Sequence, residues 1–247
     1  MKLKCRYTLT MIFPALFAFS ISGCGGSSGN SGDTASTVAI YKFDEMSGSS
    51  AMNSSQNRYN GTIYGATRVP GKVANALQFG SAGSRVEIPM VPSNMAFPSG
   101  EISIDAWIKS DTIAPGSTYQ LIGSGYYGVK SFVLALVNGQ IQFFLHDGST
   151  WRSVIVSNQT LITNTWYYVA LTYDGATAKI YIDGVEDAVH IISYPVPTSY
   201  NTLLIGCGEG DLTVGFTYEF PGIMDEVRIF RIALSATQIS DYYNSTK

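Results

Sequence analysis

Alternating hydrophobic and polar residues run through most of this chain and predict β-strands. Over residues 102–109, Ile or Ala at every second position alternates with Ser, Asp, Trp or Lys. This is the period of a strand that buries one face. Apolar segments at 132–137, 140–145, 151–156, 167–172 and 179–182 predict further strands.

Turn signals separate these strands. Asn138-Gly139, Asp147-Gly148, Asp174-Gly175 and Asp183-Gly184 each lie between two apolar segments. Both central positions of a tight hairpin turn need a positive φ, which Asn, Asp and Gly accept at low cost. The four signals predict a meander of antiparallel strands.

Helix signals are confined to the C-terminal end of the chain. The segment Ser235-Ala236-Thr237-Gln238 has the form of a capping box, so we expect a helix over 235–243. The fold class that follows is all-β: a two-sheet antiparallel jelly-roll sandwich with a short C-terminal helix.

The first 36 residues depart from the strand pattern. Three basic residues before position 7 precede a mostly apolar run over 9–21, as in a signal peptide. The segment Ile21-Ser22-Gly23-Cys24 resembles the lipobox of bacterial lipoproteins, which implies a signal peptide over 1–23 and a lipid on Cys24. An ordinary secretory signal is the alternative. Residues 25–36 have the composition of a flexible tether, so we expect a lipidated tether over 24–36 and one domain over 37–247.

Charge and cysteine content narrow the classes of partner. Without residues 1–23 the chain loses three basic and no acidic residues, keeping 12 basic and 18 acidic ones, a formal charge of −6. This balance excludes nucleic acid as an electrostatic partner and leaves the lipid anchor as the predicted contact with a membrane. Cys207 is the remaining cysteine once Cys5 and Cys24 are assigned to the N-terminal segment, so disulfides are not expected.

Two acidic pairs lie at the rims of the first and last predicted strands. Asp44-Glu45 follows the apolar run 38–43, and Asp225-Glu226 precedes the run 227–232. Chain ends often lie close together in single domains, which would bring these carboxylates to one place. Like charges held together need a cation, and calcium prefers such oxygen ligands.

Segments spread over the chain resemble the laminin-G-like, concanavalin A-like lectin/glucanase jelly roll of exported bacterial proteins. They are Tyr-Lys-Phe-Asp-Glu at 41–45, and the segments 71–79, 102–108, 166–184 and 222–230. The resemblance implies that the first and last strands are adjacent. It also implies a structural calcium ion held by Asp44, Asn57, Asn60 and Asp225 with backbone carbonyls. The alternative is that Asp44 and Asp225 cap turns and pair with Lys42 or Arg228.

Catalytic patterns are missing from the sequence. Adjacent strand residues face opposite ways, so neither acidic pair can aim both carboxylates at one glycosidic bond, which needs two carboxyl groups about 5–9.5 Å apart. The segment 209–214 is the nearest approach to the glucanase motif Glu-x-Asp-x-x-Glu, with Val214 in place of its last carboxylate. With His146 and His190 as the two histidines, a catalytic triad or a His-rich metal site is not expected. We predict that the protein is not an enzyme.

Aromatic residues in predicted loops and hairpins are the candidate ligand contacts. Trp107 and Trp166 are interpreted as core residues. Trp151 follows a polar hairpin turn, and a flat indole beside polar groups suits the apolar face of a sugar. The other candidates lie beside that turn or in two loops rich in Gly or Pro: His146, Arg152, Tyr126, Tyr127, Tyr194 and Tyr200.

These inferences lead to one functional hypothesis and two alternatives. We expect a non-catalytic module that binds a glycan or an extracellular matrix or surface protein, anchored by lipid in the cell envelope. In a Gram-negative host, Gly25 after the lipidated cysteine favours the outer membrane. The alternatives are a protein-interaction or assembly subunit without a glycan ligand, and a polysaccharide-degrading enzyme.

Overall fold

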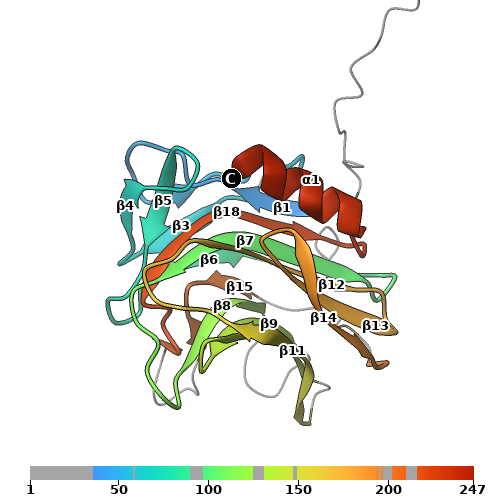
Figure 1. Ribbon diagram of the computed structural model, residues 1–247. Helices are drawn as coiled ribbons and strands as arrows, with labels where there is room; N and C mark the ends of the chain where they lie inside the picture. The colour runs from blue at the N-terminus through green and yellow to red at the C-terminus, as the bar shows by residue number, and fades with distance from the viewer. Residues whose placement is uncertain are drawn as a thin grey trace, which may run out of the picture. The chain divides into compact units, whose positions relative to one another are not determined.

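The chain folds into a two-layer β-sandwich. The computed structural model describes residues 36–57, 59–89, 97–124, 131–146, 149–194, 196, 202–209 and 216–247, which belong to the compact unit Gly32–Lys247. Two antiparallel sheets, A and B, lie face to face, and one helix lies across the outside of sheet A (Figure 1). The all-β sandwich with a short C-terminal helix is therefore confirmed.

Sheet A contains eight strands and includes both the first and the last strand of the fold. Its order is β14-β13-β12-β7-β18-β5-β4, with β1 paired to β18. The bounds are β1 Thr37–Tyr41, β4 Thr67–Pro70, β5 Asn75–Gln78, β7 Ile102–Ser110, β12 Tyr167–Tyr173, β13 Thr177–Ile182, β14 Val185–Ile191 and β18 Gly222–Phe230. Pairing of β1 with β18 confirms that the first and last strands are neighbours.

Sheet B also contains eight strands, in the order β11-β10-β9-β8-β15-β6-β3-β2. The bounds are β2 Ser50–Ala51, β3 Gly61–Tyr64, β6 Arg85–Pro89, β8 Thr118–Ser124, β9 Ser131–Val137, β10 Gln140–His146, β11 Trp151–Thr160 and β15 Thr202–Ile205. A separate pair, β16 Gly208–Glu209 and β17 Phe216–Thr217, follows β15 in the chain.

Three of the four predicted turns are described, and each joins two strands. At Asp174-Gly175 only Gly175 has a positive φ, 88°, and the Asp174 carboxylate accepts from the N–H groups of Ala176 and Thr177. Asn138 and Gly139, between β9 and β10, have φ values of 51° and 85°. Asp183 and Gly184, between β13 and β14, have 51° and 78°. Positive φ at both positions is what a two-residue hairpin requires. Asp147-Gly148 lies outside the described residues.

The central strand β7 differs from the half-buried strand that its alternation predicted. Ile102, Ile104 and Ile108 face the core between the sheets, and each is at most 1% exposed. The opposite set is buried as well: Ser103 and Asp105 are 0% exposed. A period of two shows that a strand has two different faces, but it does not show what covers the second one.

Helix α1, Ala236–Thr246, covers that second face (Figure 1). Ser235 is its N-cap, and the predicted capping box with Gln238 is present. The helix extends three residues beyond the predicted end at Tyr243. Ile239 of α1 is fully buried between the helix and sheet A in a second hydrophobic cluster, with Trp107 at 2% exposure and Trp166 packed beside it. Trp107 is therefore a core residue, as interpreted from the sequence, whereas Trp166 is only partly buried.

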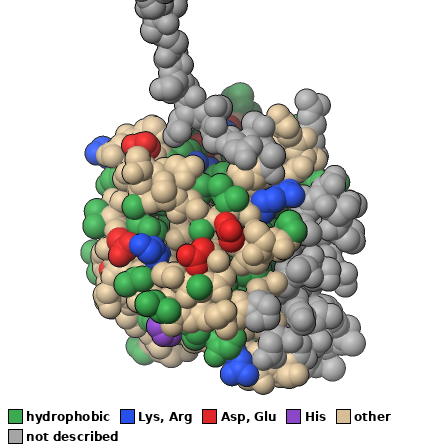
Figure 2. Space-filling model, turned by 90° about the vertical axis from the view of Figure 1, so that its right-hand side faces the viewer, with side chains coloured by type: hydrophobic (Ala, Val, Ile, Leu, Met, Phe, Trp, Pro, Cys, Tyr) green, Lys and Arg blue, Asp and Glu red, His purple; other side chains and the backbone are tan. Residues whose placement is uncertain are grey.

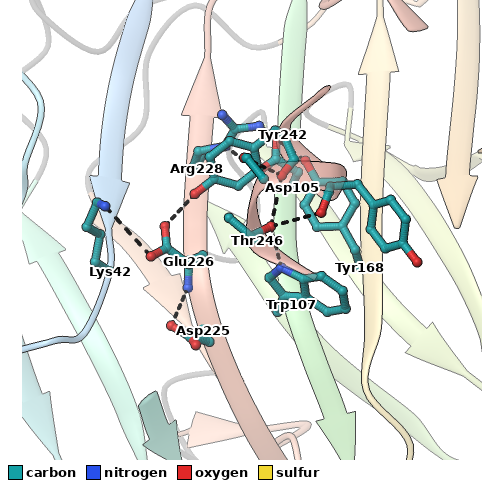
Figure 3. Close-up of polar contacts among 11 residues, drawn as sticks. Lys42, Asp105, Trp107, Tyr168, Asp225, Glu226, Arg228, Tyr242 and Thr246 are labelled. Atoms are coloured by element: carbon teal, nitrogen blue, oxygen red, sulfur yellow. Dashed lines mark hydrogen bonds and ion pairs between the residues drawn. The ribbon is translucent and has the colours of Figure 1, made fainter. Parts of the chain in front are cut away.

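A network of buried charged groups joins α1 to sheet A (Figure 3). Arg228 donates to both carboxylate oxygens of Asp105 at 2.8 Å, and its guanidinium lies 3.1 Å from the centre of the Tyr242 ring. The Tyr242 hydroxyl donates to Glu226, which is 1% exposed. Burial raises the pKa of Asp105, and the charge of Arg228 opposes that rise. The network fixes the helix on the sheet with paired charges.

Two further findings concern the N-terminal expectations. Ser36, assigned to the tether, is 5% exposed and its carbonyl accepts from Arg231 at 2.9 Å, so the folded domain begins at or before this residue. The signal peptide over 1–23, Cys24 and the remainder of the tether lie outside the described residues. Within the described part of the chain, no helix has the length and hydropathy needed to cross a bilayer.

Candidate functional site

At the acidic pair Asp225-Glu226, the last strand, β18, exchanges one neighbouring strand for another. Ile223 and Met224 of β18 pair with β5, whereas Val227 to Phe230 pair with β1. The register against β7 shifts between Asp225 and Arg228, and Glu226 has a φ of 49°. Such a β-bulge redirects side chains, and here it places both carboxylates of the pair at the junction of three strands.

Asp44 and Asp225 meet at one turn, as the calcium prediction required. The turn runs from Gly71 to Asn75, and Gly71 N–H donates to the Ala74 carbonyl at 2.9 Å. The Asp225 carboxylate accepts from the backbone N–H of Val73 at 2.8 Å, and that of Asp44 accepts from Asn75 N–H at 3.2 Å. A Cβ at Gly71 would lie 2.5 Å from Oδ2 of Asp225. Glycine therefore gives this carboxylate room against the turn.

The two asparagines predicted as ligands make other contacts. The Asn57 amide donates to the carbonyls of Thr37 and Val38 at 3.0 Å, at the opposite end of β1 from Asp44. Oδ1 of Asn60 accepts from the backbone N–H of Asn53 at 2.9 Å. Neither is hydrogen-bonded to the Gly71–Asn75 turn, so the described structure brings together two of the four predicted ligands.

The electrostatics of Asp225 suit a cation. Its side chain is 0% exposed, and burial together with the neighbouring Glu226 carboxylate raises its pKa to about 7. Among the described residues no cation pairs with it, because Arg228 pairs with Asp105 and Lys42 lies 3.8 Å from Glu226. Two carboxylates and the carbonyls of a turn are oxygen donors of the kind that calcium uses. No described group of three or more His, Cys, Asp or Glu residues forms a metal cluster, so calcium stays a prediction.

The aromatic candidates lie at one end of sheet B. Trp151 and His146 are directly opposite each other on β11 and β10, and their ring centroids are 4.9 Å apart. Trp151 is 44% exposed, whereas His146 is 8% exposed. His146 therefore supports the indole from one side, and the indole remains open to solvent.

Arg152 and Tyr194 belong to a different group from Trp151. Arg152 is opposite Leu145, a core residue, so it leaves β11 on the other side from Trp151. Its guanidinium lies 5.3 Å from the centre of the Tyr194 ring. Tyr194 was expected as an exposed loop aromatic, but it is partly buried against the core and its N–H donates to the Tyr173 hydroxyl at 2.7 Å. Backbone contacts with a core tyrosine hold it there.

Tyr126, Tyr127 and Tyr200 lie outside the described residues. The strand ends that flank their loops are described, however, and they are adjacent. Ser124 at the end of β8 pairs with Leu203 near the start of β15 and with Phe132 of β9. Ser131 then pairs with His146. The chain thus enters or leaves both loops at the same edge of sheet B as the Trp151–His146 pair.

Sequence reasoning missed the residues beside this pair on the outer face of sheet B. Core residues Phe132, Leu134 and Leu136 alternate along β9 with outward-facing positions. The outward residues of four neighbouring strands are Gln120 and Gly123 of β8, Val133 and Ala135 of β9, Gln142 and Phe144 of β10, and Ser153 and Val156 of β11. The alternation of Gln140–His146 was the signal available, but it did not show which face would stay free of a helix.

The part of this outer face formed by β8 to β11 is covered by no described helix, although Ala135 within it is 0% exposed. Charged residues face outward elsewhere on the sheet, because Arg85 and Glu87 of β6 alternate with the core residues Val86 and Ile88. None of those eight outward residues is Asp, Glu, Lys or Arg. On sheet A, in contrast, the acidic pairs bind protein groups: Glu45 contacts Arg68 at 2.9 Å, and Glu226 accepts from Tyr242. An aromatic ring next to neutral amides can contact the apolar face of a ligand and hydrogen bond at its rim.

Comparison with solved structures finds other proteins that have the same fold. Domain 4 of AbnA, a GH43 extracellular arabinanase from Geobacillus stearothermophilus in complex with arabinotriose, is 22% identical with a TM-score of 0.66, over 83% of this chain and 97% of that chain. The receptor binding domain of botulinum neurotoxin D is 18% identical with a TM-score of 0.65 over 86% of this chain. The match covers 53% of the toxin chain, so this protein spans about half its length. At these identities the likeness shows the fold.

Sequence comparison gives the family. A search of curated proteins gives no match. A family profile described as concanavalin A-like lectin/glucanases superfamily, Laminin_G_3, matches residues 79–240, which is more than half of the chain. The match runs from the end of β5 into α1 and includes the Trp151–His146 pair and the amides beside it. The chain therefore belongs to the concanavalin A-like lectin/glucanases superfamily.

Proposed function

We propose that this protein is a non-catalytic carbohydrate-binding module whose ligand contacts Trp151 on the outer face of sheet B. The observation that carries the proposal is the half-exposed indole held at 4.9 Å from the His146 ring, beside outward residues of β8 to β11 that carry no charge. A sugar ring presents an apolar face and hydroxyl groups at its edge, which match an indole bordered by Gln and Ser side chains. Family membership and the arabinotriose complex of domain 4 of AbnA support a sugar ligand.

The proposal includes the envelope location and the calcium ion. A lipid on Cys24 and a tether over 25–35 would hold the module at the cell envelope. Calcium would be held by Asp44, Asp225 and carbonyls of the Gly71–Asn75 turn, where it would stabilise the junction of β1, β5 and β18. Mass spectrometry of the protein purified from membranes tests the lipid, because a diacylglyceryl or triacyl mass on Cys24 is expected and an unmodified Cys24 contradicts it.

Binding to immobilised polysaccharides tests the sugar ligand. We expect the purified protein to be retained by at least one of arabinan, xylan and laminarin, and Trp151→Ala to weaken retention at least tenfold, because loss of stacking on an aromatic ring removes most of the apolar contact. Tyr64→Ala is the matched control: Tyr64 is 43% exposed on β3 of the same sheet, outside the proposed surface. Equal retention of Trp151→Ala and the unaltered protein would contradict the placement of the site.

A second candidate function is supported by a different surface. On the side of the molecule formed by β13 and β14, hydrophobic side chains lie among charged ones (Figure 2). Val185, Val189 and Ile191 of β14 are 69%, 55% and 82% exposed. Exposed apolar side chains on an edge strand favour contact with another protein. If Val189→Lys with Ile191→Lys abolishes a protein complex and leaves polysaccharide retention intact, this surface serves as a protein interface in addition to the sugar site.

A further inference from the structure

The chain enters the folded domain at the same end of the sandwich at which Trp151 lies. On sheet A, the carbonyl of Ser36 accepts from the N–H of Arg231 at 2.9 Å. The carbonyl of Arg231 in turn accepts from the hydroxyl of Ser99 at 3.3 Å, and Ser99 lies two residues after Phe97 in the chain. We call the end of the molecule that contains Ser36, Ser99 and Arg231 the Ser36 end.

Packing between the two sheets extends the Ser36 end to sheet B. The ring of Phe97 meets the ring of Phe132 of β9 edge to face, with the ring centroids 5.8 Å apart. The neighbour of Phe132, Ser131, is paired with His146 on β10, and His146 packs against Trp151. The Trp151–His146 pair therefore lies at the Ser36 end.

A second series of contacts gives the same result. Tyr173 at the end of β12 is paired with Ile102 at the start of β7. The Tyr173 hydroxyl donates to the carbonyl of Tyr194 at 2.7 Å. The Tyr194 ring lies 5.3 Å from the guanidinium of Arg152, the residue after Trp151 on β11. Contacts between the sheets therefore join the start of β7, at the Ser36 end, to the start of β11.

The C-terminus lies elsewhere, on the outer face of sheet A. The indole N–H of Trp107 donates to the hydroxyl of Thr246 at 2.9 Å, and Trp107 is paired with Asp225. Phe230, by contrast, is paired with Thr37 at the start of β1. The segment of β18 from Asp225 to Phe230 spans about 17 Å. In Figure 1, β1 begins near one end of α1 and the C-terminus lies at the other, so the two termini of the domain lie on different sides of it.

The length of the predicted tether limits how the domain can turn on a membrane. Twelve residues, 24–35, carry the proposed lipid and lead to Ser36. A chain of this composition and length has an r.m.s. span of about 20 Å, whereas a domain of about 210 residues is about 40 Å across. To bring the opposite end of the domain to the membrane, the tether would have to approach its full extension of about 40 Å. A shorter span leaves the Ser36 end facing the membrane.

We propose that the ligand of the Trp151 site is a glycan carried by the same membrane that holds the lipid on Cys24, so that the protein binds a component of its own cell envelope. This inference rests on the proposed function and adds where the ligand is attached. Trp151 lies about 25 Å from Ser36, because five strand spacings separate β1 from β14 and one sheet spacing separates β14 from β11. A glycan in the same membrane meets the site at an effective concentration of about 1 mM, an advantage that a glycan on another cell lacks.

Anchoring the protein to vesicles in two orientations tests the inference. The N-anchored form has a hexahistidine tag in place of residues 1–24. The C-anchored form carries the tag after Lys247 on a copy of residues 25–35, which keeps the tether the same. Both forms bind vesicles that contain a nickel-chelating lipid. The probe is a hexasaccharide of arabinan, xylan or laminarin, whichever polymer is retained, either soluble and fluorescent or conjugated to a lipid.

Two measurements distinguish binding on one membrane from binding between membranes. Uptake of the soluble hexasaccharide, with the conjugate in the same vesicles, reports how many sites are already occupied on that membrane. Aggregation with separate vesicles that carry the conjugate reports sites that face away from the anchoring membrane. Trp151→Ala and Tyr64→Ala are measured in both forms as the site variant and its matched control.

We expect the conjugate in the same vesicles to lower uptake at least about fivefold in the N-anchored form and less than about twofold in the C-anchored form. Aggregation should be stronger in the C-anchored form, and Trp151→Ala, but not Tyr64→Ala, should abolish both uptake and aggregation. Equal results for the two orientations, or stronger aggregation by the N-anchored form, would overturn the inference, while uptake of the soluble probe would still support the proposed function. If neither form takes up any of the three soluble hexasaccharides, the proposed function fails and the inference fails with it.

Discussion

The outer faces of the two sheets differ in how their polar side chains are satisfied. On sheet A, Asp105, Arg228 and Glu226 are buried beneath α1 and each has a protein partner (Figure 3). On sheet B, Gln120 and Gln142 have no side-chain partner among the described residues. Buried polar groups are usually hydrogen-bonded. The comparison shows that the helix covers the polar groups of one face from within the chain, whereas no described helix covers those of the other.

The ion pair under the helix should give the largest effect on stability. Arg228→Ala leaves Asp105 fully buried with its compensating charge removed, which costs about 3–5 kcal/mol in comparable buried pairs. Urea denaturation followed by circular dichroism measures this loss in the free energy of unfolding. Retention on polysaccharide, measured at a temperature where the variant is folded, should not change, because Arg228 lies on the opposite sheet from Trp151.

A surface ion pair supplies the control for that prediction. Lys179 contacts Glu186 at 2.7 Å on sheet A, and the two side chains are 37% and 41% exposed. Lys179→Ala should cost less than about 1 kcal/mol, because water replaces most of such a contact. If Arg228→Ala costs no more than Lys179→Ala, the charges under α1 do not fix the helix on the sheet, and the contrast between the two faces loses its physical basis.

Loss of the Tyr242 hydroxyl, which donates to Glu226, should lower the stability less than loss of Arg228 does. Tyr242→Phe removes the hydroxyl that donates to this buried carboxylate while the ring remains in contact with Arg228. An unsatisfied buried polar group costs about 1–3 kcal/mol, and thermal unfolding at neutral pH measures this loss of stability. Tyr243→Phe is the matched control, because the Tyr243 hydroxyl makes no hydrogen bond with the described residues. A loss in Tyr242→Phe no larger than in Tyr243→Phe would show that Glu226 obtains its compensation elsewhere.

The sequence predicted the strands of both sheets better than the roles of their outer faces. Strand alternation and Asn-Gly or Asp-Gly turns are local signals, and they located β7, the hairpin of β9 with β10, and the Trp151–His146 end of sheet B. Coverage of Asp105 by α1 depends on a contact between distant segments, which alternation does not encode.

The sequence brought together only two of the four predicted calcium ligands, and the reason is related. Asp44 and Asp225 could be placed together because chain ends tend to meet and because β1 pairs with β18. The two asparagines were predicted as ligands from the family resemblance alone. Asn57 does not reach the turn, and it donates to the carbonyls of Thr37 and Val38. Asp225 is thus the carboxylate on the sheet A side that neither the helix nor a described cation compensates.

Calcium should change the free energy of unfolding less than the loss of Arg228 or of the Tyr242 hydroxyl does. At ten times its dissociation constant, an ion that binds only the folded state adds about 1.4 kcal/mol to the free energy of unfolding. We expect millimolar calcium to raise the melting temperature of protein treated with EDTA, and Asp225→Asn to remove the increase. Asp241→Asn, on α1, is the charge-matched control. Unchanged melting on addition of millimolar calcium would exclude the ion.

The pH dependence of the free energy of unfolding, measured without metal, distinguishes a cation site from a buried carboxyl group that binds no ion. The pKa of Asp225 is raised to about 7 in the folded state, against about 3.9 in an unfolded chain. The folded state therefore binds this proton more tightly, and its contribution to stability is complete below about pH 4 and lost as the pH rises through 7. In EDTA, the loss of unfolding free energy between pH 5 and 8 should be smaller in Asp225→Asn than in the unaltered protein. Because calcium needs the ionised carboxylate, its stabilising effect should be larger at pH 8 than at pH 6. Equal calcium effects at the two pH values would show that the ion binds away from Asp225.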